Sequence, residues 1–174
     1  MLKNFDKNQN YYKFYKRKNI PIVFIHGVGL DHEMWLPQVK SFKNNSILVY
    51  DLLGHGKTPL IKKDVKFEDF SNQLNNLLNN LNINKINLVG FSFGSLIAVN
   101  FVKRFQTKVN KLVLISTVYK RNNLEKINVR ERYKKAKKNI SISNLALNRW
   151  LSSKFIKLNP KIKKYILKTL NKNK

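Results

Sequence analysis

Short, almost continuously apolar runs alternate with helical patterns over the first two thirds of the chain, and this alternation limits the possible folds most. The runs are rich in Val, Ile and Leu, and they lie at residues 20–25, 46–52, 86–90 and 111–117. Strands that are apolar at every position are typical of a parallel sheet that is covered on both faces. Apolar residues recur at helical spacing in the intervals, at residues 33–42, 67–81 and 93–104. This order predicts a doubly wound, mostly parallel α/β fold.

The pattern changes near the start and again after residue 117. Residues 11–17 predict an additional strand at the edge of the sheet. After residue 117 only helices are expected, with one apolar stripe at Leu147, Trp150, Leu151 and Phe155 and another at Ile162, Tyr165, Ile166 and Leu170. Residues 119–174 also hold 18 Lys and Arg but only 2 acidic residues. We therefore expect a core domain at residues 1–118 and a basic helical segment at residues 119–174.

The net charge is high, with 35 Lys and Arg against 9 Asp and Glu, or +26 in 174 residues. Such an excess is typical of proteins that bind nucleic acid or anionic membranes. However, Lys outnumbers Arg by 29 to 6, although Arg is the better phosphate ligand. Residues with AT-rich codons also predominate throughout, so the simplest interpretation is codon composition. We do not expect a nucleic-acid partner, and a polyanion-binding face in residues 119–174 stays open as the alternative.

Several classes of protein and chemistry are excluded by composition. The chain has no Cys, which removes disulfides, thiolate metal sites and a Cys nucleophile. Residues 1–18 are polar and lack the apolar region of a signal peptide. No apolar run approaches the roughly 18 residues that a membrane helix needs. We therefore expect a cytoplasmic protein without a membrane span.

The sequence Gly90-Phe91-Ser92-Phe93-Gly94 has the pattern G-x-S-x-G. In a nucleophile elbow this pattern lies between a strand and a helix, where a strained turn exposes the Ser hydroxyl above the sheet. Both neighbours are predicted here, because a strand precedes the motif and a helix follows it. Ser92 is therefore the candidate nucleophile, and an ordinary Gly-Ser turn is the alternative.

A second Gly-rich turn, His26-Gly27-Val28-Gly29, follows the strand at residues 20–25. Such a turn can supply one backbone N–H to an oxyanion, and the residue after the nucleophile can supply another. This nominates Val28 and Phe93 as the two donors. For His26 itself we expect hydrogen bonds to loop backbone rather than a role as base or metal ligand.

Taken together, these motifs resemble the α/β-hydrolase fold superfamily. The resemblance rests on the turn at residues 26–29, Trp35, Asp51-Leu52-Leu53-Gly54-His55-Gly56-Lys57-Thr58 and the motif at residues 90–94, in that order. It implies a serine hydrolase of small carboxylic esters or lactones that needs no cofactor or metal, with Ser92 as nucleophile and a helical cap from about residue 119. The motif residues that it implies are His26, Gly27, Gly29, Asp51, Gly54, His55, Gly56, Gly90 and Gly94.

The C-terminal segment is more weakly similar to the cap of 3-oxoadipate enol-lactonase-like members. The similarity lies in Arg149-Trp150-Leu151, Phe155 and Asn159-Pro160. By the same resemblance, Phe91 and Trp150 are candidate substrate-binding residues.

The segment at residues 54–58 imitates the end of a phosphate-binding P-loop. That motif needs a Gly where Asp51 stands, and Pro59 follows where a helix would have to begin. We therefore expect no nucleotide-binding site.

The resemblance stops before the triad is complete. In this fold the triad residues follow the order Ser, acid, His, but the chain has no His after Ser92, and the acids after it are Glu125 and Glu131. We therefore interpret the chain as the N-terminal portion of a hydrolase, with an unpaired apolar sheet edge at residues 111–117. The alternative is a non-catalytic protein on the same fold whose basic segment binds a polyanion.

The three histidines all precede Ser92. His55 lies in a loop after a strand, but the resemblance gives that loop no base role. The adjacent Asp31, His32 and Glu33 cannot all point at one metal ion from the start of a helix, so we expect surface capping there.

Overall fold

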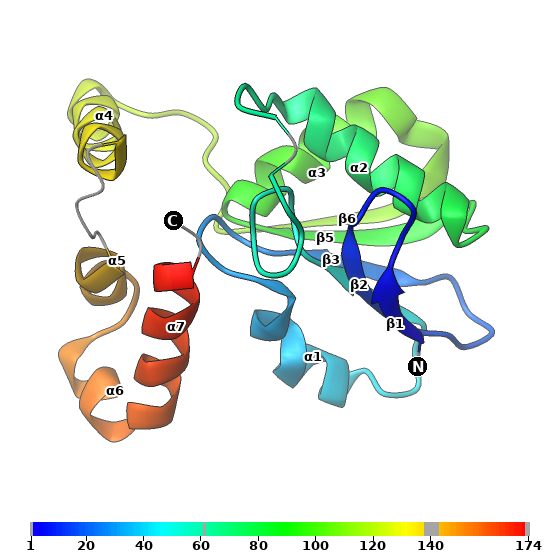
Figure 1. Ribbon diagram of the computed structural model, residues 1–174, viewed down its shortest axis with the longest axis horizontal. Coiled ribbons are helices and arrows are strands. Elements are labelled where there is room, and N and C mark those ends of the chain that lie inside the picture. Colours follow the sequence, from blue (N-terminus) through cyan, green and yellow to red (C-terminus); the bar gives the residue numbers. More distant parts are fainter. Residues whose placement is uncertain (1, 61, 138–142, 173–174) are drawn as a thin grey trace. The chain divides into compact units, whose positions relative to one another are not determined.

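The computed structural model describes residues 2–60, 62–137 and 143–172 (Figure 1). The chain divides into two compact units, Met1–Thr117 and Val118–Lys174. None of the helices in these ranges combines the length and the apolar character that crossing a membrane requires.

A mostly parallel sheet of six strands forms the centre of the first unit. The strands are β1 (Leu2–Phe5), β2 (Tyr11–Tyr15), β3 (Ile22–Ile25), β4 (Ile47–Tyr50), β5 (Ile86–Phe91) and β6 (Val109–Ile115). Their spatial order is β1-β2-β4-β3-β5-β6, with β3, β4, β5 and β6 parallel and β1 and β2 antiparallel to their neighbours. The sheet confirms the predicted α/β fold and places the carboxyl ends of β3 and β5 side by side.

The edge strand predicted at residues 11–17 is not at the edge. It is β2, which pairs with β1 on one side and with β4 on the other. The sequence Leu2–Phe5 gives no strand signal, because it is short and lacks β-branched residues. It pairs with β2 through a turn in which Asp6 Oδ1 accepts hydrogen bonds from the backbone N–H groups of Asn8 and Asn10.

Helices cover both faces of the sheet, as expected for buried parallel strands. α2 (Phe67–Asn80) and α3 (Phe93–Phe105) cover one face, whereas η1 (His32–Trp35) and α1 (Leu36–Ser41) cover the other (Figure 1). The helix predicted at residues 33–42 thus begins as a 3₁₀ turn. A large core cluster lies on the side of α2 and α3, and a smaller one around Trp35 lies on the side of α1.

Strand β6 is the last strand of the described sheet and pairs with β5 alone. Its side chains Leu112, Val113, Leu114 and Ile115 are apolar and exposed, whereas every residue of β4 is buried. The expected apolar edge at this strand is confirmed. The 3₁₀ turn η2 (Gln106–Lys108) follows α3 and precedes β6. After β6 the chain enters the second unit.

The described part of the second unit is helical. It contains α4 (Asn123–Lys137), α5 (Ser143–Trp150), α6 (Ser153–Leu158) and α7 (Pro160–Lys172), and α7 packs against α5 and α6. The continuous stripe predicted from Leu147 to Phe155 is wrong. Helix α5 ends at Trp150, and Ser152 caps the start of α6 because its Oγ accepts a hydrogen bond from Phe155 N–H. The two helices do not share one stripe: Leu147 is buried, whereas Phe155 is exposed.

Candidate active site

Ser92 lies between the last residue of β5 and the first residue of α3, in a strained backbone conformation. Its φ and ψ angles are 52° and −112°, a region that non-Gly residues rarely occupy. Such strain persists only where the surroundings hold it. Ser92 N–H donates to the carbonyl oxygen of Ile115 on β6 at 2.9 Å, and its carbonyl accepts from Ser95 N–H at 3.0 Å and from Ser95 Oγ. The geometry is that of a nucleophile elbow.

The two glycines of the motif let the helix start pack directly onto the ends of two strands. A Cβ at Gly90 would lie 2.5 Å from the carbonyl oxygen of Gly94. A Cβ at Gly94 would lie 2.5 Å from the carbonyl oxygen of Ile25 and 2.6 Å from that of His26. These approaches leave no space for a side chain, so the elbow requires glycine at both positions.

The two candidate oxyanion donors follow neighbouring strands. Ile25 pairs with Gly90 in the β3–β5 register, so Val28 and Phe93 both lie just beyond the same edge of the sheet. Phe93 is the first residue of α3, and the first N–H groups of a helix have no intrahelical acceptor. The Val28 side chain is exposed. The arrangement has the elements of an oxyanion hole, and the role of both donors stays a prediction.

His26 is a structural residue that holds loop backbone. It is fully buried, its Nε2 accepts from Leu52 N–H at 3.0 Å, and its Nδ1–H donates to the carbonyl oxygen of Gly27 at 2.8 Å. These partners use both ring nitrogens and fix the neutral ring. Burial and the neighbouring His55 lower the pKa of His26 to about 3. His26 therefore links the turn after β3 to the loop after β4.

Asp51 organises the loop after β4. Its partner is His32, for which the predicted position at the surface is wrong. His32 is buried, not on the surface, and its Nδ1 lies 2.7 Å from Asp51 Oδ1. Asp51 also accepts from the backbone N–H groups of His32 and Lys57. Burial alone would raise the pKa of Asp51, but these hydrogen bonds and the His32 charge outweigh it, so the pKa lies below its usual value. The expected cap is formed by Asp31, which accepts from Glu33 N–H.

Glycine permits this loop to close around the Asp51 carboxylate. Gly56 has a φ of 56°, and a Cβ there would overlap the carboxylate. Gly54 and Gly29 also take positive φ angles. The motif at residues 51–58 is therefore a structural turn, and its Asp and last Gly are required together.

His55 lies beside His26, with their ring centroids 5.3 Å apart. Its Nδ1–H donates to the carbonyl oxygen of Leu53 at 2.9 Å, which leaves the lone pair on Nε2. Burial lowers the pKa of His55. In the described ranges, the imidazoles hydrogen-bond to groups other than Ser92. The same ranges contain no group of three or more His, Asp or Glu side chains that could hold a metal ion.

These buried groups predict acid lability. A His whose pKa is lowered on folding binds its proton more readily in the unfolded chain, so its contribution to stability is full above pH 6.5 and is lost as the pH falls toward 3. We expect the free energy of unfolding to fall by about 1.4 kcal/mol per pH unit for His26 in this window. Urea unfolding at a series of pH values from 7 to 4 measures how the free energy of unfolding depends on pH. In the His26→Gln variant, the free energy of unfolding should vary less with pH, by the contribution of one proton. An unchanged pH dependence would contradict the assignment.

The two candidate substrate-binding residues have different surroundings. The half-buried Phe91 ring packs edge-on to Trp35, with centroids 6.5 Å apart, and contacts the smaller core cluster. Trp150 is half-buried at the end of α5 in the second unit. Contact of either residue with substrate stays a prediction.

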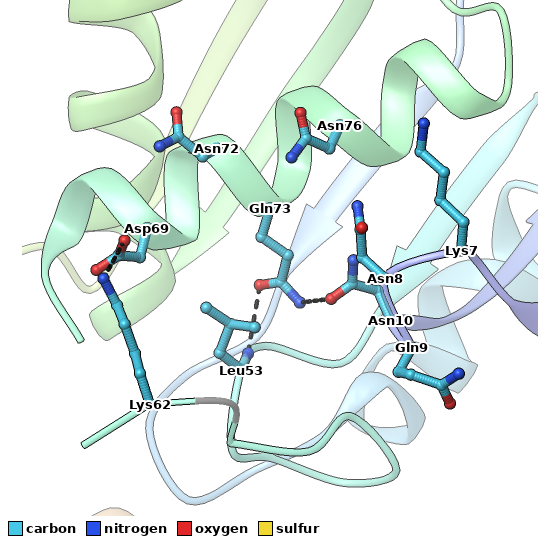
Figure 2. Close-up of a pocket in the computed structure, with 10 residues that line it drawn as sticks. All are labelled: Lys7, Asn8, Gln9, Asn10, Leu53, Lys62, Asp69, Asn72, Gln73 and Asn76. Carbon is cyan, nitrogen blue, oxygen red and sulfur yellow. Dashed lines mark hydrogen bonds and ion pairs between the residues drawn. The ribbon is translucent and has the colours of Figure 1, made fainter. Parts of the chain in front are cut away.

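A polar cavity lies between α2, the β1–β2 turn and the segment after β4, and it shares no residue with the elbow. Figure 2 shows amide side chains from α2 and from the β1–β2 turn around it, with Gln73 at its base. Gln73 donates to Asn10 Oδ1 and to the carbonyl oxygen of Asp51, and accepts from Leu53 N–H. Gln73 thus fixes the same loop backbone as His26, a role that the sequence pattern did not reveal.

The comparisons with known proteins agree with this geometry. The profile of the family described as the alpha/beta hydrolase fold matches residues 20–143. The chain therefore belongs to the α/β-hydrolase fold family.

Several of the curated relatives are named as hydrolases. The chain is 30% identical over 144 residues to the (E)-2-((N-methylformamido)methylene)succinate hydrolase of Acinetobacter baylyi, covering 82% of this chain and 55% of the relative. It is 36% identical over 84 residues to 3-oxoadipate enol-lactonase 1 of the same species, covering 47% and 31%. The chain thus spans about half, or less, of the curated relatives that it matches.

Solved structures share the fold. The enol-lactonase from Burkholderia xenovorans LB400 has a TM-score of 0.83 at 24% identity, covering 95% of this chain and 67% of that one. A thermophilic esterase from Thermogutta terrifontis has a TM-score of 0.81 at 22% identity, covering 97% and 64%.

Proposed function

We propose that the complete protein is a serine hydrolase of small carboxylic esters or lactones, with Ser92 as its nucleophile. The observation that carries the proposal is the strained backbone of Ser92 between β5 and α3. The name of one relative, an enol-lactonase, supports this substrate class, and the name of another, a hydrolase of a substituted succinate, supports hydrolysis of a small molecule.

In the proposed reaction, Ser92 Oγ attacks the carbonyl carbon and its proton passes to a base. The carbonyl π electrons move to the oxygen, and the N–H groups of Val28 and Phe93 stabilise the oxyanion. Collapse of the tetrahedral intermediate breaks the bond to the alkoxy oxygen, which receives the proton. Water then releases the acyl group from Ser92 by the same steps. In a lactone the alcohol stays attached to the acyl group.

The base and its acid are the missing parts of this reaction. His26 and His32 are buried and bound to other partners, and Asp51 accepts hydrogen bonds from His32 and Lys57. The match to the first relative covers 55% of its length, and we infer that the acid and the His belong to the part of the fold outside this match. We also propose that the second unit serves as a cap and that the protein acts in the cytoplasm.

Replacing Ser92 with Ala should abolish ester hydrolysis by the protein translated from the complete reading frame. In serine proteases, loss of the nucleophile lowers turnover on the order of 10⁶-fold. Hydrolysis of p-nitrophenyl esters and of simple lactones measures the loss. Ser116→Ala is a matched control, because Ser116 also has a φ of 52° and carries the same change. Equal, undiminished activity of the two variants would sink the assignment of Ser92, and an unmodified protein without hydrolase activity would favour a non-catalytic protein.

A further inference from the structure

Three large apolar side chains are exposed where α6 meets α7. Phe155 and Leu158 on α6 and Ile162 on α7 are 39%, 71% and 41% exposed. Single exposed apolar residues are ordinary, but a group of them at one site indicates an interaction surface. We call this group, together with the lysines described next, the α6–α7 corner.

Exposed lysines accompany these apolar side chains. They are Lys154 and Lys157 on α6 and Lys161, Lys163 and Lys164 on α7. Helix α7 packs against α5, and toward its C-terminal end Thr169 is buried and Ser143 Oγ donates to Asn171 Oδ1 at 2.7 Å. The lysines of the corner therefore extend into solvent.

The sequence around the corner carries no acidic residue. The sequence from residue 132 to residue 174 contains neither Asp nor Glu. The acids of the second unit are Glu125 and Glu131 on α4, and Glu131 lies 2.8 Å from Lys134. Lysines occur along the whole chain, and the feature particular to the corner is that they accompany exposed apolar side chains.

We propose that the α6–α7 corner binds the surface of an anionic lipid bilayer. Phe155, Leu158 and Ile162 would enter the boundary between headgroups and acyl chains, and the lysines would contact lipid phosphates. Leu158 and Ile162 cannot stack on bases, and the cations are Lys rather than the Arg that nucleic-acid surfaces favour. The chemistry therefore fits lipid better than nucleic acid. This proposal is independent of the hydrolase activity.

Vesicle flotation with residues 1–174 tests the proposal, because bound protein rises with lipid whereas aggregated protein sediments. We expect flotation with phosphatidylcholine vesicles that contain phosphatidylglycerol, and none with phosphatidylcholine alone. Raising the salt from about 0.1 M to about 0.5 M should weaken binding at least tenfold, because it screens the lysines.

Paired variants assign the binding to the corner. Leu158→Ser combined with Ile162→Ser should lower the bound fraction roughly tenfold. Leu124→Ser is the control, because Leu124 on α4 is 66% exposed but lies outside the corner. Lys157→Gln with Lys161→Gln should act like the serine pair, and Lys126→Gln on α4 should not. Circular dichroism verifies that each variant keeps its helix content.

Three results would overturn the proposal. The first is equal flotation with both kinds of vesicle, and the second is equal binding by the corner variants and their α4 controls. The third is retardation of a single-stranded RNA in a gel-shift assay together with no flotation, which would indicate that the basic second unit binds nucleic acid instead.

Discussion

Residues 1–174 on their own are expected to hydrolyse p-nitrophenyl esters no faster than their Ser92→Ala variant. A Ser hydroxyl is a poor nucleophile until a base within hydrogen-bond reach removes its proton. The two fully enclosed imidazoles have other partners, because His26 holds Leu52 and Gly27, and His32 holds Asp51. The expected turnover is on the order of 10⁶-fold below that of a complete serine hydrolase.

A fluorophosphonate probe makes this prediction sharper than turnover alone. Labelling of Ser92 should be slow and no faster than labelling of Ser116, which shares its backbone angle but not its elbow. The tryptophan emission of Trp35, which is buried beside β3, shows that the tested chain is folded. Rapid stoichiometric labelling at Ser92 would instead demonstrate a base within the chain. His55→Gln would then identify it, because His55 keeps a lone pair on Nε2.

The second large effect is expected at Gly94, where Ala should lower the free energy of unfolding by about 3 kcal/mol. Two opposing effects act at this position in the first turn of α3. Ala favours a helix by about 1 kcal/mol over Gly. However, its Cβ would lie 2.5 Å from the carbonyl oxygen of Ile25, and backbone at the end of a buried strand cannot move away easily. The clash therefore decides the sign.

Gly27→Ala is the matched control for this measurement. A Cβ at Gly27 would lie 3.0 Å from a ring carbon of Phe91, a side chain that can shift, so we expect a loss of about 1 kcal/mol. Urea unfolding in a Trp150→Phe background lets Trp35 report on the first unit alone. Equal losses at Gly27 and Gly94 would show that the elbow does not pack against β3 as described.

The parts of this structure that follow from local sequence were predictable. The buried strands β3, β4 and β5 are apolar at nearly every position, and the elbow needs only a strand, a G-x-S-x-G motif and a helix in direct succession. Strand β1 escaped prediction because its four residues owe their conformation to pairing with β2.

Long-range pairs were beyond sequence reasoning for a different reason. His32 is separated from Asp51 by 19 residues, and Gln73 from Asn10 by 63. Nothing near His32 in the sequence distinguishes a surface cap from a buried partner, because its burial depends on where β4 places Asp51. A buried Asp after a strand, followed by two Gly at alternate positions, was the one signal that this loop closes on a carboxylate.

Every observed support of the Ser92 backbone lies within Met1–Thr117. Ile115 accepts its N–H, Ser95 binds its carbonyl, and Gly94 fits against the end of β3. The strained backbone of Ser92 therefore uses no described contact with the helices that follow β6. Under the proposed cap role of the second unit, changes in residues 118–174 would alter substrate access and leave every described support of this strained turn in place.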